Sequence, residues 1–364
     1  MKHDFYKLKV VQVVDETDDS KSIYFQIPDE LKNEFKYKAG QYLTLKFLID
    51  QEEHRRSYSL CTSPHEGKWA VNVKRVSKGL ISNYINDHVK NDDIIEVMNP
   101  DGKFVNEVDE TARRNHFFFA AGSGITPIIS IIKDVLENEP KSNCYLLYGN
   151  KDEKSIIFHE ELKELAKKYE GQLSLHITLS KPLRKKSTGV KGLFSRGKIS
   201  WEGMTGRING EKIESLLKLA DDNSKENQYY VCGPGAMIDT IIDYLETKGV
   251  ESQFLHTEHF VSSAPPMGST SGVVKSLVKV HLSGKSYEVE VPEDKTILEQ
   301  LIDSKIDPPY SCTSGACSTC VAKVSTGKVS MDACYALDEG EIRQGYILTC
   351  QSRALTPQIE LTFE

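Results

Sequence analysis

Apolar and polar residues alternate over residues 5–104 in short runs that are separated by closely spaced turn residues. The runs include "YLTLKFLI", "RSYSL" and "WAVNVKRV". Alternation with a period of two places successive side chains on opposite faces of a strand, and frequent turns join such strands into a barrel or a sandwich. We therefore predict a first domain over residues 1–106 that is an antiparallel β-barrel.

The pattern changes at His116, where strand-like and helix-like runs begin to alternate. "HFFFAA" precedes "TPIISIIKDVLEN", "NCYLLYG" precedes "HEELKELAKKY", and "QYYVCGP" precedes "AMIDTIIDYLETKG". Alternation of β and α is typical of a parallel sheet that is covered by helices on both faces. The sequence thus predicts a second domain, of the α/β parallel-sheet class, over residues 107–261.

A third unit follows a segment without periodicity. "SSAPPMGSTSG" is rich in small residues, Pro and Gly, which is typical of a flexible linker, and we place the linker at residues 262–273. Beyond it, "LVKVHL" and "YEVEVP" predict a β-hairpin, and "TILEQLIDSK" predicts a helix. Residues 274–364 are therefore predicted to form a small α+β domain.

Composition excludes several classes of protein. The chain has 364 residues and a formal net charge of −7, so it lacks the basic face that binding to nucleic acid requires. Its N-terminus has no apolar signal segment. Its longest uncharged run, "FFFAAGSGITPIISII", contains Gly and Pro and is shorter than the roughly 18 apolar residues that span a bilayer. We expect a cytoplasmic protein with no membrane segment and no nucleic-acid partner.

The charge is unevenly distributed along the chain. Residues 276–364 hold 13 acidic and 8 basic side chains, whereas residues 181–200 hold seven Lys or Arg and no acid. An acidic surface can dock a partner or simply be solvated, and a basic run can bind an anion or form a surface loop. The sequence leaves both pairs of alternatives open.

Four of the eight cysteines follow the spacing of a plant-type iron–sulfur site. Cys312, Cys317 and Cys320 form C-x4-C-x2-C, and Cys350 lies thirty positions further on. Thiolates are soft ligands that suit iron–sulfur clusters or zinc. A zinc site normally pairs C-x2-C with a second C-x2-C or with histidines, and neither accompanies this loop. We predict a [2Fe–2S] cluster, with zinc as the alternative, and interpret Cys334, outside the spacing, as a buried thiol.

Two glycine-rich turns follow predicted strands of the α/β domain. In "FFFAAGSGITPIIS" the strand runs into Gly122 and Gly124, and Thr126 is the predicted N-cap of the next helix. Such a turn offers free N–H groups and the positive end of a helix dipole to a phosphate, but it is also an ordinary strand-to-helix turn. The "CGP" sequence at residues 232–234 ends another strand, at the edge where open α/β sheets bind ligands. Two such turns at one edge favour a nucleotide.

The barrel contributes a second group of candidate ligand-binding residues. "RRSYSL" places Arg56 and Tyr58 on one face of a strand, beside Ser59. Arginine can bind a phosphate with two N–H groups, and tyrosine can cover a planar ring. Further on, Gly79 lies at a turn and Ser82 near a predicted helix start, which is a second phosphate-type site. These residues are also compatible with an ordinary strand and turn.

Together, the three segments resemble the ferredoxin–NADP reductase superfamily fused to a C-terminal plant-type ferredoxin. The resemblance covers essentially the whole chain and rests on "RSYS", the Gly-x-Gly-x-Thr-Pro turn, "CGP" and the cysteine spacing. It implies an FAD-binding barrel, an NAD(P)-binding α/β domain and a β-grasp ferredoxin domain. The basic stretch 181–200 is longer than the resemblance leads us to expect.

The resemblance also implies roles for individual residues. Arg56 would hold the FAD pyrophosphate, Tyr58 would stack on the isoalloxazine ring, and Ser59 would approach its N5 atom. Glu258 and Phe260 of "TEHF" would close the α/β domain against the flavin. The residues implied as catalytic are Ser59, Cys232 and Glu258. The residues implied in cofactor binding are Arg56, Tyr58, Ser59, Lys74, Gly79, Ser82, Gly122, Gly124, Thr126, Cys232, Gly233, Pro234 and Phe260, and the implied cluster ligands are Cys312, Cys317, Cys320 and Cys350.

The choice of nucleotide depends on the residues after the third strand of the α/β domain. Ser180 and Lys181 follow that strand, and three further cations lie at residues 184–186. Cations suit a 2′-phosphate, whereas an NAD site more often offers an acid to the ribose hydroxyl. NADPH is therefore favoured over NADH.

A protein of this kind would be an NAD(P)H-dependent oxidoreductase. A hydride would pass from the nicotinamide to FAD, and the flavin would release electrons singly to the cluster. The acceptor would be an oxygenase or hydroxylase that docks at the acidic ferredoxin domain, with the di-iron phenylacetyl-CoA epoxidase as the first candidate. The alternatives are a reductase for another hydroxylase, desaturase or P450-type partner, and a redox-responsive scaffold whose turnover is incidental.

Overall fold

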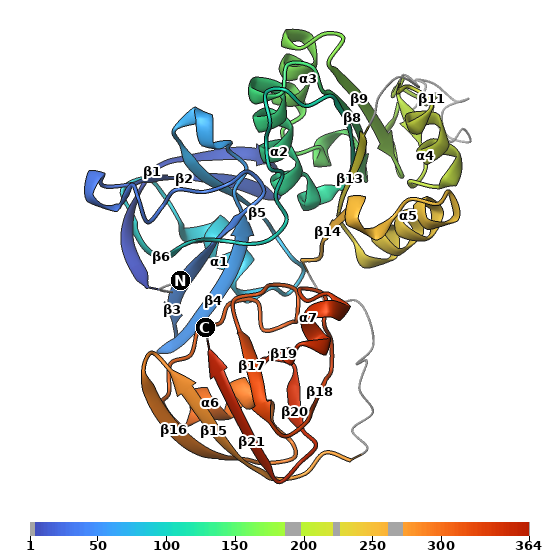
Figure 1. Cartoon of the computed structure of the whole chain (residues 1–364). Coiled ribbons are helices and arrows are strands. Elements are labelled where there is room, and N and C mark those ends of the chain that lie inside the picture. The colour runs from blue at the N-terminus through green and yellow to red at the C-terminus, as the bar shows by residue number, and fades with distance from the viewer. Residues whose placement is uncertain (1–3, 186–197, 221–225, 261–271, 364) are drawn as a thin grey trace, which may run out of the picture.

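The structure is a computed structural model that describes residues 4–185, 198–220, 226–260 and 272–363. These residues form three units, which are blue, green to yellow, and orange to red in Figure 1. Most of the predicted linker 262–273 and the middle of the basic stretch 181–200 lie outside the described residues.

The first unit is a six-stranded antiparallel sheet. Its elements are β1 (Phe5–Thr17), β2 (Ser20–Gln26), β3 (Tyr42–Ile49), β4 (Glu52–Ser59), β5 (Trp69–Lys74), α1 (Leu80–His88) and β6 (Ile94–Asp101). The strand order is β4-β3-β6-β1-β2-β5. Alternate residues such as Leu8 and Val10 are fully buried in the core, as the pattern predicts. A bridge between Leu60 and Val71 brings the two edges of the sheet together, which gives the barrel.

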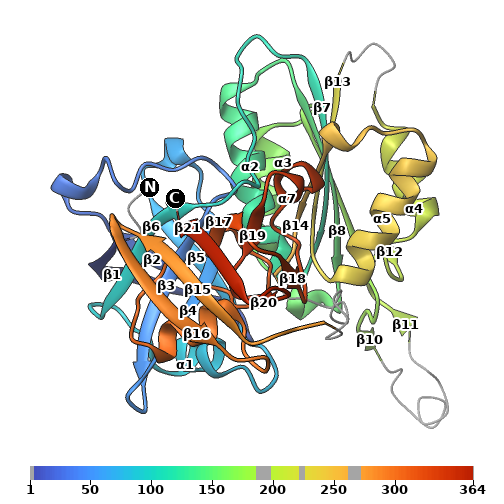
Figure 2. The ribbon, with the colours of Figure 1, turned by 60° about the horizontal axis from the view of Figure 1, so that its bottom comes forward.

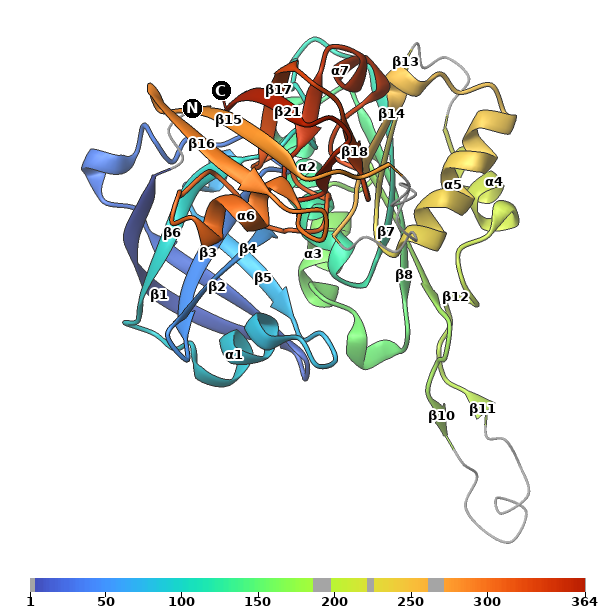
Figure 3. The ribbon, with the colours of Figure 1, turned by 90° about the horizontal axis from the view of Figure 1, so that it is seen from below.

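The second unit is a parallel sheet with helices on both faces. Its main elements are β7 (Arg114–Ala121), α2 (Ile125–Asn138), β8 (Asn143–Asn150), α3 (His159–Lys168), β9 (Leu173–Leu179), β12 (Met204–Thr205), α4 (Gly210–Leu217), β13 (Glu226–Cys232), α5 (Gly235–Thr247) and β14 (Leu255–Glu258). The order is β12-β9-β8-β7-β13-β14. Helices α2 and α3 cover the face that contains Phe118, and α4 and α5 cover the face that contains Phe117 (Figure 2). A short hairpin of β10 (Arg184–Lys185) and β11 (Lys198–Ile199) lies at the outer end of this unit (Figure 3).

The third unit is a small mixed sheet with one helix packed on it. It contains β15 (Ser276–Leu282), β16 (Lys285–Val291), α6 (Ile297–Asp303), β17 (Val321–Thr326), β18 (Val329–Met331), α7 (Glu339–Arg343), β19 (Tyr346–Leu348), β20 (Ser352–Ala354) and β21 (Gln358–Phe363). The predicted hairpin is present as β15 and β16, and β15 also pairs in parallel with β21. Ile297 and Leu301 bury one face of α6 against the sheet. This arrangement is the predicted β-grasp fold.

The third unit lies against β3 and β4 of the barrel (Figures 1 and 3). Arg55 of β4 is almost fully buried there and forms an ion pair with Asp307 at 2.7 Å. Its guanidinium also lies 4.1 Å from the ring centre of Tyr310. Across the boundary with the second unit, His259 stacks on Tyr335 with 4.6 Å between ring centres. The third unit therefore contacts both of the others.

One local prediction, the N-cap of α2, was wrong by two residues. Thr126 is not the N-cap of α2, because the helix begins at Ile125 and Gly124 precedes it. Residues Gly122–Gly124 form a 3-10 turn that runs directly into the helix. The hydroxyl of Thr126 instead donates to the carbonyl of Ser123 at 3.0 Å. Thr126 thus lies in the first turn of the helix.

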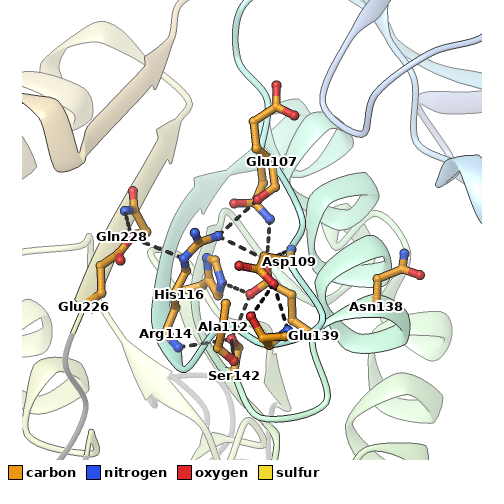
Figure 4. Close-up of polar contacts among 12 residues, drawn as sticks. Glu107, Asp109, Ala112, Arg114, His116, Asn138, Glu139, Ser142, Glu226 and Gln228 are labelled. Carbon is orange, nitrogen blue, oxygen red and sulfur yellow. Dashed lines mark hydrogen bonds and ion pairs between the residues drawn. The ribbon is translucent and has the colours of Figure 1, made fainter.

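A buried polar network occupies the edge of the parallel sheet where β7 begins (Figure 4). Glu139, just after α2, accepts hydrogen bonds from Ser142 at 2.7 Å and from Asn106 at 3.1 Å. It is also hydrogen-bonded to Nε2 of His116 at 2.9 Å and forms an ion pair with Arg114 at 3.3 Å, and the side chains of His116 and Glu139 are completely buried. Burial alone would raise the pKa of Glu139, but the bond to His116 and the other donors lower it to about 2. The carboxylate therefore stays ionised. Its hydrogen bond from Asn106 connects the end of the barrel unit to the residue that follows α2.

Candidate active site

A central cavity of about 390 Å³ lies where the three units meet. The barrel strands β4 and β5 and helix α1 form one side, the turn before α2 and the end of β14 form another, and the cysteine loop of the third unit closes it. The sequence-predicted residues that line it are Arg56, Tyr58, Ser59, Lys74, Gly79, Ser82, Thr126, Glu258, Phe260, Cys312 and Cys317. Residues from all three predicted sites thus share one space.

Strand β4 supplies the polar wall of this cavity. Arg56 pairs with Leu45 and Tyr58 pairs with Leu43 across the β3–β4 ladder, so that Arg56 and Tyr58 lie on the same face of the strand. Arg56 donates to the carbonyl of Arg55 at 2.6 Å, and no carboxylate among the described residues pairs with it. Burial raises the pKa of Tyr58 above its usual range, so the ring keeps its proton. The guanidinium is available for an anion.

The start of α1 forms a second anion-compatible wall. Gly79 directly precedes the helix, and a Cβ atom there would lie 2.7 Å from the Ser82 hydroxyl and 2.9 Å from Cβ of Val76. A larger residue would therefore displace the turn. Gly79, Leu80 and Ser82 all face the cavity, where the first N–H groups of the helix have no intrahelical partners. A phosphate suits this position.

Glu258 connects the α/β unit to the barrel at the cavity wall. It ends β14, next to Cys232 of β13 in the parallel register, and it accepts a hydrogen bond from the Ser59 hydroxyl at 3.3 Å. Burial raises the pKa of Glu258 to about 8, although the bond from Ser59 opposes this shift. The side chain is therefore mostly protonated at neutral pH. Cys232 itself is fully buried behind this wall and lines neither the central cavity nor the outer one described next.

An outer cavity of about 870 Å³ adjoins the central one along the carboxyl ends of the parallel strands. Its lining includes the sequence-predicted residues Lys74, Gly122, Ser180, Gly233, Pro234 and Phe260. Lys74, Ser123 and Phe260 line both cavities, so the two spaces are continuous there. The predicted residue Lys181 is not part of the lining, which instead includes Lys151 and Arg207.

Gly124 lines neither cavity, but it allows the two glycine turns to pack closely against each other. A Cβ atom at Gly124 would lie 2.1 Å from the carbonyl oxygen of Cys232. The turn before α2 and the end of β13 can therefore approach each other only with glycine at this position. Its contribution to the site is close backbone packing.

The four cysteines of the predicted cluster site converge in the third unit. The backbone N–H groups of Ser314 and Cys317 lie 3.4 and 3.3 Å from the Cys312 sulfur and donate to it. The Cys312 thiol is within hydrogen-bonding reach of Cys317 and Cys350, and Cys350 is within reach of Cys320. Four neighbouring thiols, with two N–H donors at the Cys312 sulfur, fit an iron–sulfur cluster. Cys334, predicted to be a buried thiol, is only partly buried and packs against the side chains around Cys320 and Cys350. Its thiol lies 4.0 Å from the carbonyl of Leu337.

Several cavity residues were not predicted from the sequence. Tyr42, Ser57, Asn72 and His259 all line the central cavity. The side-chain oxygen of Asn72 and the Nδ1 atom of His259 are buried and have no hydrogen-bond partner among the described residues. Buried polar atoms without a partner are rare, and here both belong to side chains that line the cavity. A polar cofactor in the cavity fits these atoms.

Comparison with protein families agrees with the three units. Residues 7–106 match the oxidoreductase FAD-binding domain, residues 118–243 match the oxidoreductase NAD-binding domain, and residues 280–355 match the 2Fe-2S iron–sulfur cluster binding domain. Relatives match over nearly the whole chain as well. The chain belongs to the family of flavin- and iron–sulfur-dependent ferredoxin reductases that are components of oxygenase systems.

Individual relatives cover almost all of the chain. It is 33% identical over 363 residues to a component of the 1,2-phenylacetyl-CoA epoxidase of Escherichia coli (strain K12), and the match covers 99% of this chain and 98% of the relative. It is 35% identical to the 3-ketosteroid-9-alpha-monooxygenase, ferredoxin reductase component, of Rhodococcus rhodochrous, with 98% and 96% covered. The solved structure of phthalate dioxygenase reductase matches with a TM-score of 0.59 at 24% identity, covering 99% of this chain and 98% of that one.

These comparisons confirm the predicted family, fold class and cofactors. The protein is an NAD(P)H-dependent oxidoreductase with FAD and a [2Fe–2S] cluster as cofactors and a pyridine nucleotide as substrate. No helix within the described residues is long and apolar enough to cross a membrane.

Proposed function

We propose that this chain takes electrons from NADPH and delivers them singly to an oxygenase. The observation that carries the proposal is the central cavity, which residues of the barrel, the α/β unit and the cysteine loop line together. Bound FAD supplies the conversion of a two-electron hydride into single electrons, and the cluster supplies a one-electron carrier. The thiol ligands that this function needs are stable in a reducing compartment such as the cytoplasm.

In this proposal the central cavity holds FAD. Arg56 binds the pyrophosphate, with Lys74 nearby, and the first turn of α1 from Gly79 to Ser82 offers its N–H groups to the same anion. Tyr58 covers the flavin ring, and Ser59 lies beside the atom that receives the hydride. Replacement of Arg56 by Ala should release FAD from the purified protein, measured as the ratio of bound flavin to protein. Full FAD content in that variant would contradict the assignment.

The outer cavity receives the nucleotide, and the residues that line it favour NADPH. The turn at Gly122 and the strand end at Gly233 and Pro234 approach the phosphates. Thr126, Glu258 and Phe260 would bring the nicotinamide against the flavin, with Cys232 behind Glu258. Near Ser180, the cavity lining includes Lys151 and Arg207, and none of the described residues that line it is an acid. Cations without an acid suit the 2′-phosphate of NADPH.

Steady-state rates with NADPH and NADH test this choice. We expect a lower KM for NADPH, and replacement of Arg207 by Ala should raise the KM for NADPH more than that for NADH. The parallel change at Lys181, outside the cavity lining, is the matched control. A clear preference of the wild type for NADH would reverse the assignment.

Cys312, Cys317, Cys320 and Cys350 are proposed to hold the [2Fe–2S] cluster. Replacement of Cys317 by Ser should abolish the iron content and leave FAD in place, because the proposed FAD contacts lie mainly on the barrel. The same change at Cys334, which stands outside the group, is the control and should retain iron. A full iron complement in the Cys317 variant would contradict the ligand assignment.

The proposed electron acceptor is an oxygenase, with a di-iron phenylacetyl-CoA epoxidase as the first candidate and a steroid-type hydroxylase as the second. The names of the two full-length relatives support these candidates. Reduction of each candidate oxygenase by the purified chain decides between them. Absence of transfer to either, with rapid reduction of an artificial acceptor, would leave another partner class as the acceptor and reject both candidates.

The acidic patch, defined as Asp332, Asp338, Glu339 and Glu341, is the proposed docking surface. Asp332 pairs with Arg353, and Glu341 pairs with Lys103. Glu339 pairs with Arg343 at 3.7 Å, and its side chain is 92% exposed. Charge complementarity mainly raises the association rate of such transient complexes. Replacement of Glu339 by Lys should slow electron delivery at low salt, and the same change at exposed Glu288 on the distant strand β16 is the control. Delivery that is indifferent to both salt and Glu339 would show that the partner docks elsewhere.

A further inference from the structure

The two faces of strand β4 have different neighbours. Arg56 and Tyr58, the proposed FAD residues, lie on one face, and Arg55 and Ser57 lie on the other. Both Arg55 and Ser57 hydrogen-bond to side chains of the third unit, which lies against this part of the barrel (Figures 1 and 3). The spacing between the proposed flavin site and the cysteine loop therefore depends on how the third unit packs on β4.

Arg55 is the buried centre of this contact. Its side chain is 5% exposed, and it forms ion pairs with Glu53 of the same strand at 2.6 Å and with Asp307 of the third unit at 2.7 Å. The guanidinium also lies 4.1 Å from the ring centre of Tyr310. Arg55 thus binds to the barrel and to the third unit at once, and its planar, multiply donating group suits both contacts.

The segment 307–310, with the sequence DPPY, leads directly to the cysteine loop through Ser311 and Cys312. Its two prolines fix the backbone φ angle at two successive positions, so the segment is stiff. The hydroxyl of Ser311 accepts a hydrogen bond from Thr44 of β3 at 3.1 Å and lies 2.6 Å from the hydroxyl of Ser57. Packing of this segment on β3 and β4 therefore sets where the cysteine loop begins.

We propose that Arg55 is a positioning residue for electron transfer from the flavin to the cluster, an inference that rests on the proposed function. In this step one electron leaves the flavin, which is oxidised, and enters the cluster, which is reduced, and no atom is transferred. Arg55 contacts neither group. It holds the third unit on one face of β4 while Arg56 and Tyr58 hold the flavin on the other, so that the cysteine loop and the flavin keep one spacing.

The burial of Arg55 makes it the anchor of this contact. Interfaces between units of one chain resemble transient protein–protein interfaces, in which a few buried Arg, Tyr or Trp side chains contribute most of the binding free energy. The neighbouring contacts include the hydroxyl pairs of Ser311 and the partly exposed ion pair of Lys103 with Glu341, which contribute less. Loss of the Arg55 side chain should therefore shift the docking equilibrium of the third unit about tenfold toward separation.

Carbodiimide cross-linking of the full chain measures this docking without electron transfer. Lys103, at the end of the barrel, and Glu341 of α7 form an ion pair between the first and third units. Carbodiimide converts such a pair into an amide bond that mass spectrometry identifies. Arg55→Ala should lower the yield of this cross-link about threefold to tenfold. The pair of Lys295 and Asp303, 2.5 Å apart within the third unit, is the internal control and should cross-link equally in the wild type and the variant.

Anaerobic stopped-flow mixing with NADPH is the second measurement. Arg55→Ala should slow the cluster phase by a similar factor and leave the flavin phase unchanged, which a general loss of barrel structure would not do. Asp307→Ala should have a smaller effect in the same direction, and the double variant should be no slower than Arg55→Ala, because both changes remove the same contact. Asp303→Ala, at another exposed acid of the third unit, is the matched control and should leave both phases unchanged.

A wild-type cross-link yield or a wild-type cluster phase in Arg55→Ala, at full FAD and iron content, would overturn the proposal, as would equal slowing of both phases. If Arg55→Ala does not fold, Arg55→Lys and Asp307→Ala decide, since lysine keeps the charge but loses the planar contact with Tyr310. Both should then lower the cross-link yield and slow the cluster phase. Absence of FAD or iron from the wild type would instead reject the proposed function, so the two failures are distinct.

Discussion

Two glutamates lie at opposite ends of the strands of the same parallel sheet. They differ in the hydrogen bonds and ion pairs that surround the carboxyl group. Glu139, at the edge where the strands begin, is fully buried and has four side-chain partners in His116, Ser142, Asn106 and Arg114. Glu258, at the edge where the strands end, lines the central cavity and receives one weak bond, from Ser59. Burial acts on both carboxyls, yet the pKa is about 2 for Glu139 and about 8 for Glu258.

The difference indicates which edge stabilises the fold and which performs chemistry. A buried carboxylate whose oxygens have a full set of partners maintains structure. A carboxyl that is desolvated without compensation is unfavourable for folding alone, and such groups occur preferentially at functional sites. Glu258, with its single side-chain partner, lies at the carboxyl ends of the strands, where open α/β sheets bind ligands.

The largest expected effect is on stability. Replacement of Glu139 by Ala leaves His116 and Arg114 without their buried partner and should lower the free energy of unfolding by about 3–5 kcal/mol. Replacement of Glu258 by Ala should lower it by no more than about 1 kcal/mol, because its single contact is weak. Urea unfolding of both variants measures the contrast. Equal losses would contradict the division between the two edges.

The next effect is on the rate of flavin reduction by NADPH. If the protonated form of Glu258 supports the reaction, the rate should fall about tenfold between pH 7 and pH 9, as a group with a pKa of about 8 ionises. Glu258→Gln retains a hydrogen-bond donor and cannot ionise, so its rate should be nearly constant over this range. Stopped-flow absorbance at the flavin bands provides the measurement. Identical pH profiles in the two proteins would exclude Glu258 as the titrating group.

The pH dependence of stability should show the same contrast with opposite signs. The pKa of Glu139 is lowered from 4.5 to about 2. Its stabilising contribution to the free energy of unfolding is therefore present above pH 4.5 and is lost as the pH falls toward 2. The pKa of Glu258 is raised from 4.5 to about 8, so its contribution is present below pH 4.5 and is lost as the pH rises toward 8. Each proton that is bound differently in the folded and unfolded states changes the free energy of unfolding by at most about 1.4 kcal/mol per pH unit.

Urea midpoints between pH 3 and pH 9 test these slopes in the wild type and in the two Glu→Gln variants. Glu139→Gln should flatten the acid limb, and Glu258→Gln should flatten the decline in stability between pH 4.5 and pH 8. A Glu258→Gln variant that retains this decline in full would show that another group is responsible.

The smallest effect concerns a more exposed member of the Glu139 network. Arg114 also pairs with Glu226 at 3.2 Å, and the Glu226 side chain is 40% exposed. Exposed ion pairs contribute little, so Glu226→Gln should lower the free energy of unfolding by less than about 1 kcal/mol, well below the loss in Glu139→Gln. A loss at Glu226 as large as that at Glu139 would show that burial does not decide the difference.

The sequence predicted local features well because local patterns determine them. The period-two runs became β1–β6, the alternating runs became β7–β9 and β13 with their helices, and the cysteine spacing matched a cluster-binding domain. Arg56, Tyr58 and Gly79 line the central cavity because strand alternation and a turn residue place them there. The N-cap of α2 was missed by two residues, since a 3-10 turn and an α-helical turn have the same sequence signals.

Features that depend on distant residues were not predictable. Tyr42 resembles any strand tyrosine, and its partner Thr319 lies 277 positions away. The pairing of Glu139 with His116, and the place of Arg207 in the outer cavity, likewise follow from tertiary packing and not from spacing along the chain. Such contacts become visible only in the folded structure.

The central claim is that electrons pass from nucleotide to flavin to cluster inside one molecule, through the cavity that the three units share. Anaerobic stopped-flow mixing of the purified chain with NADPH, followed at flavin and cluster absorbance over a tenfold range of protein concentration, tests it most directly. We predict that flavin reduction precedes cluster reduction and that the rate constant of the cluster phase is independent of protein concentration. A cluster phase whose rate rises in proportion to protein concentration would show transfer between molecules and would contradict the shared cavity as the route.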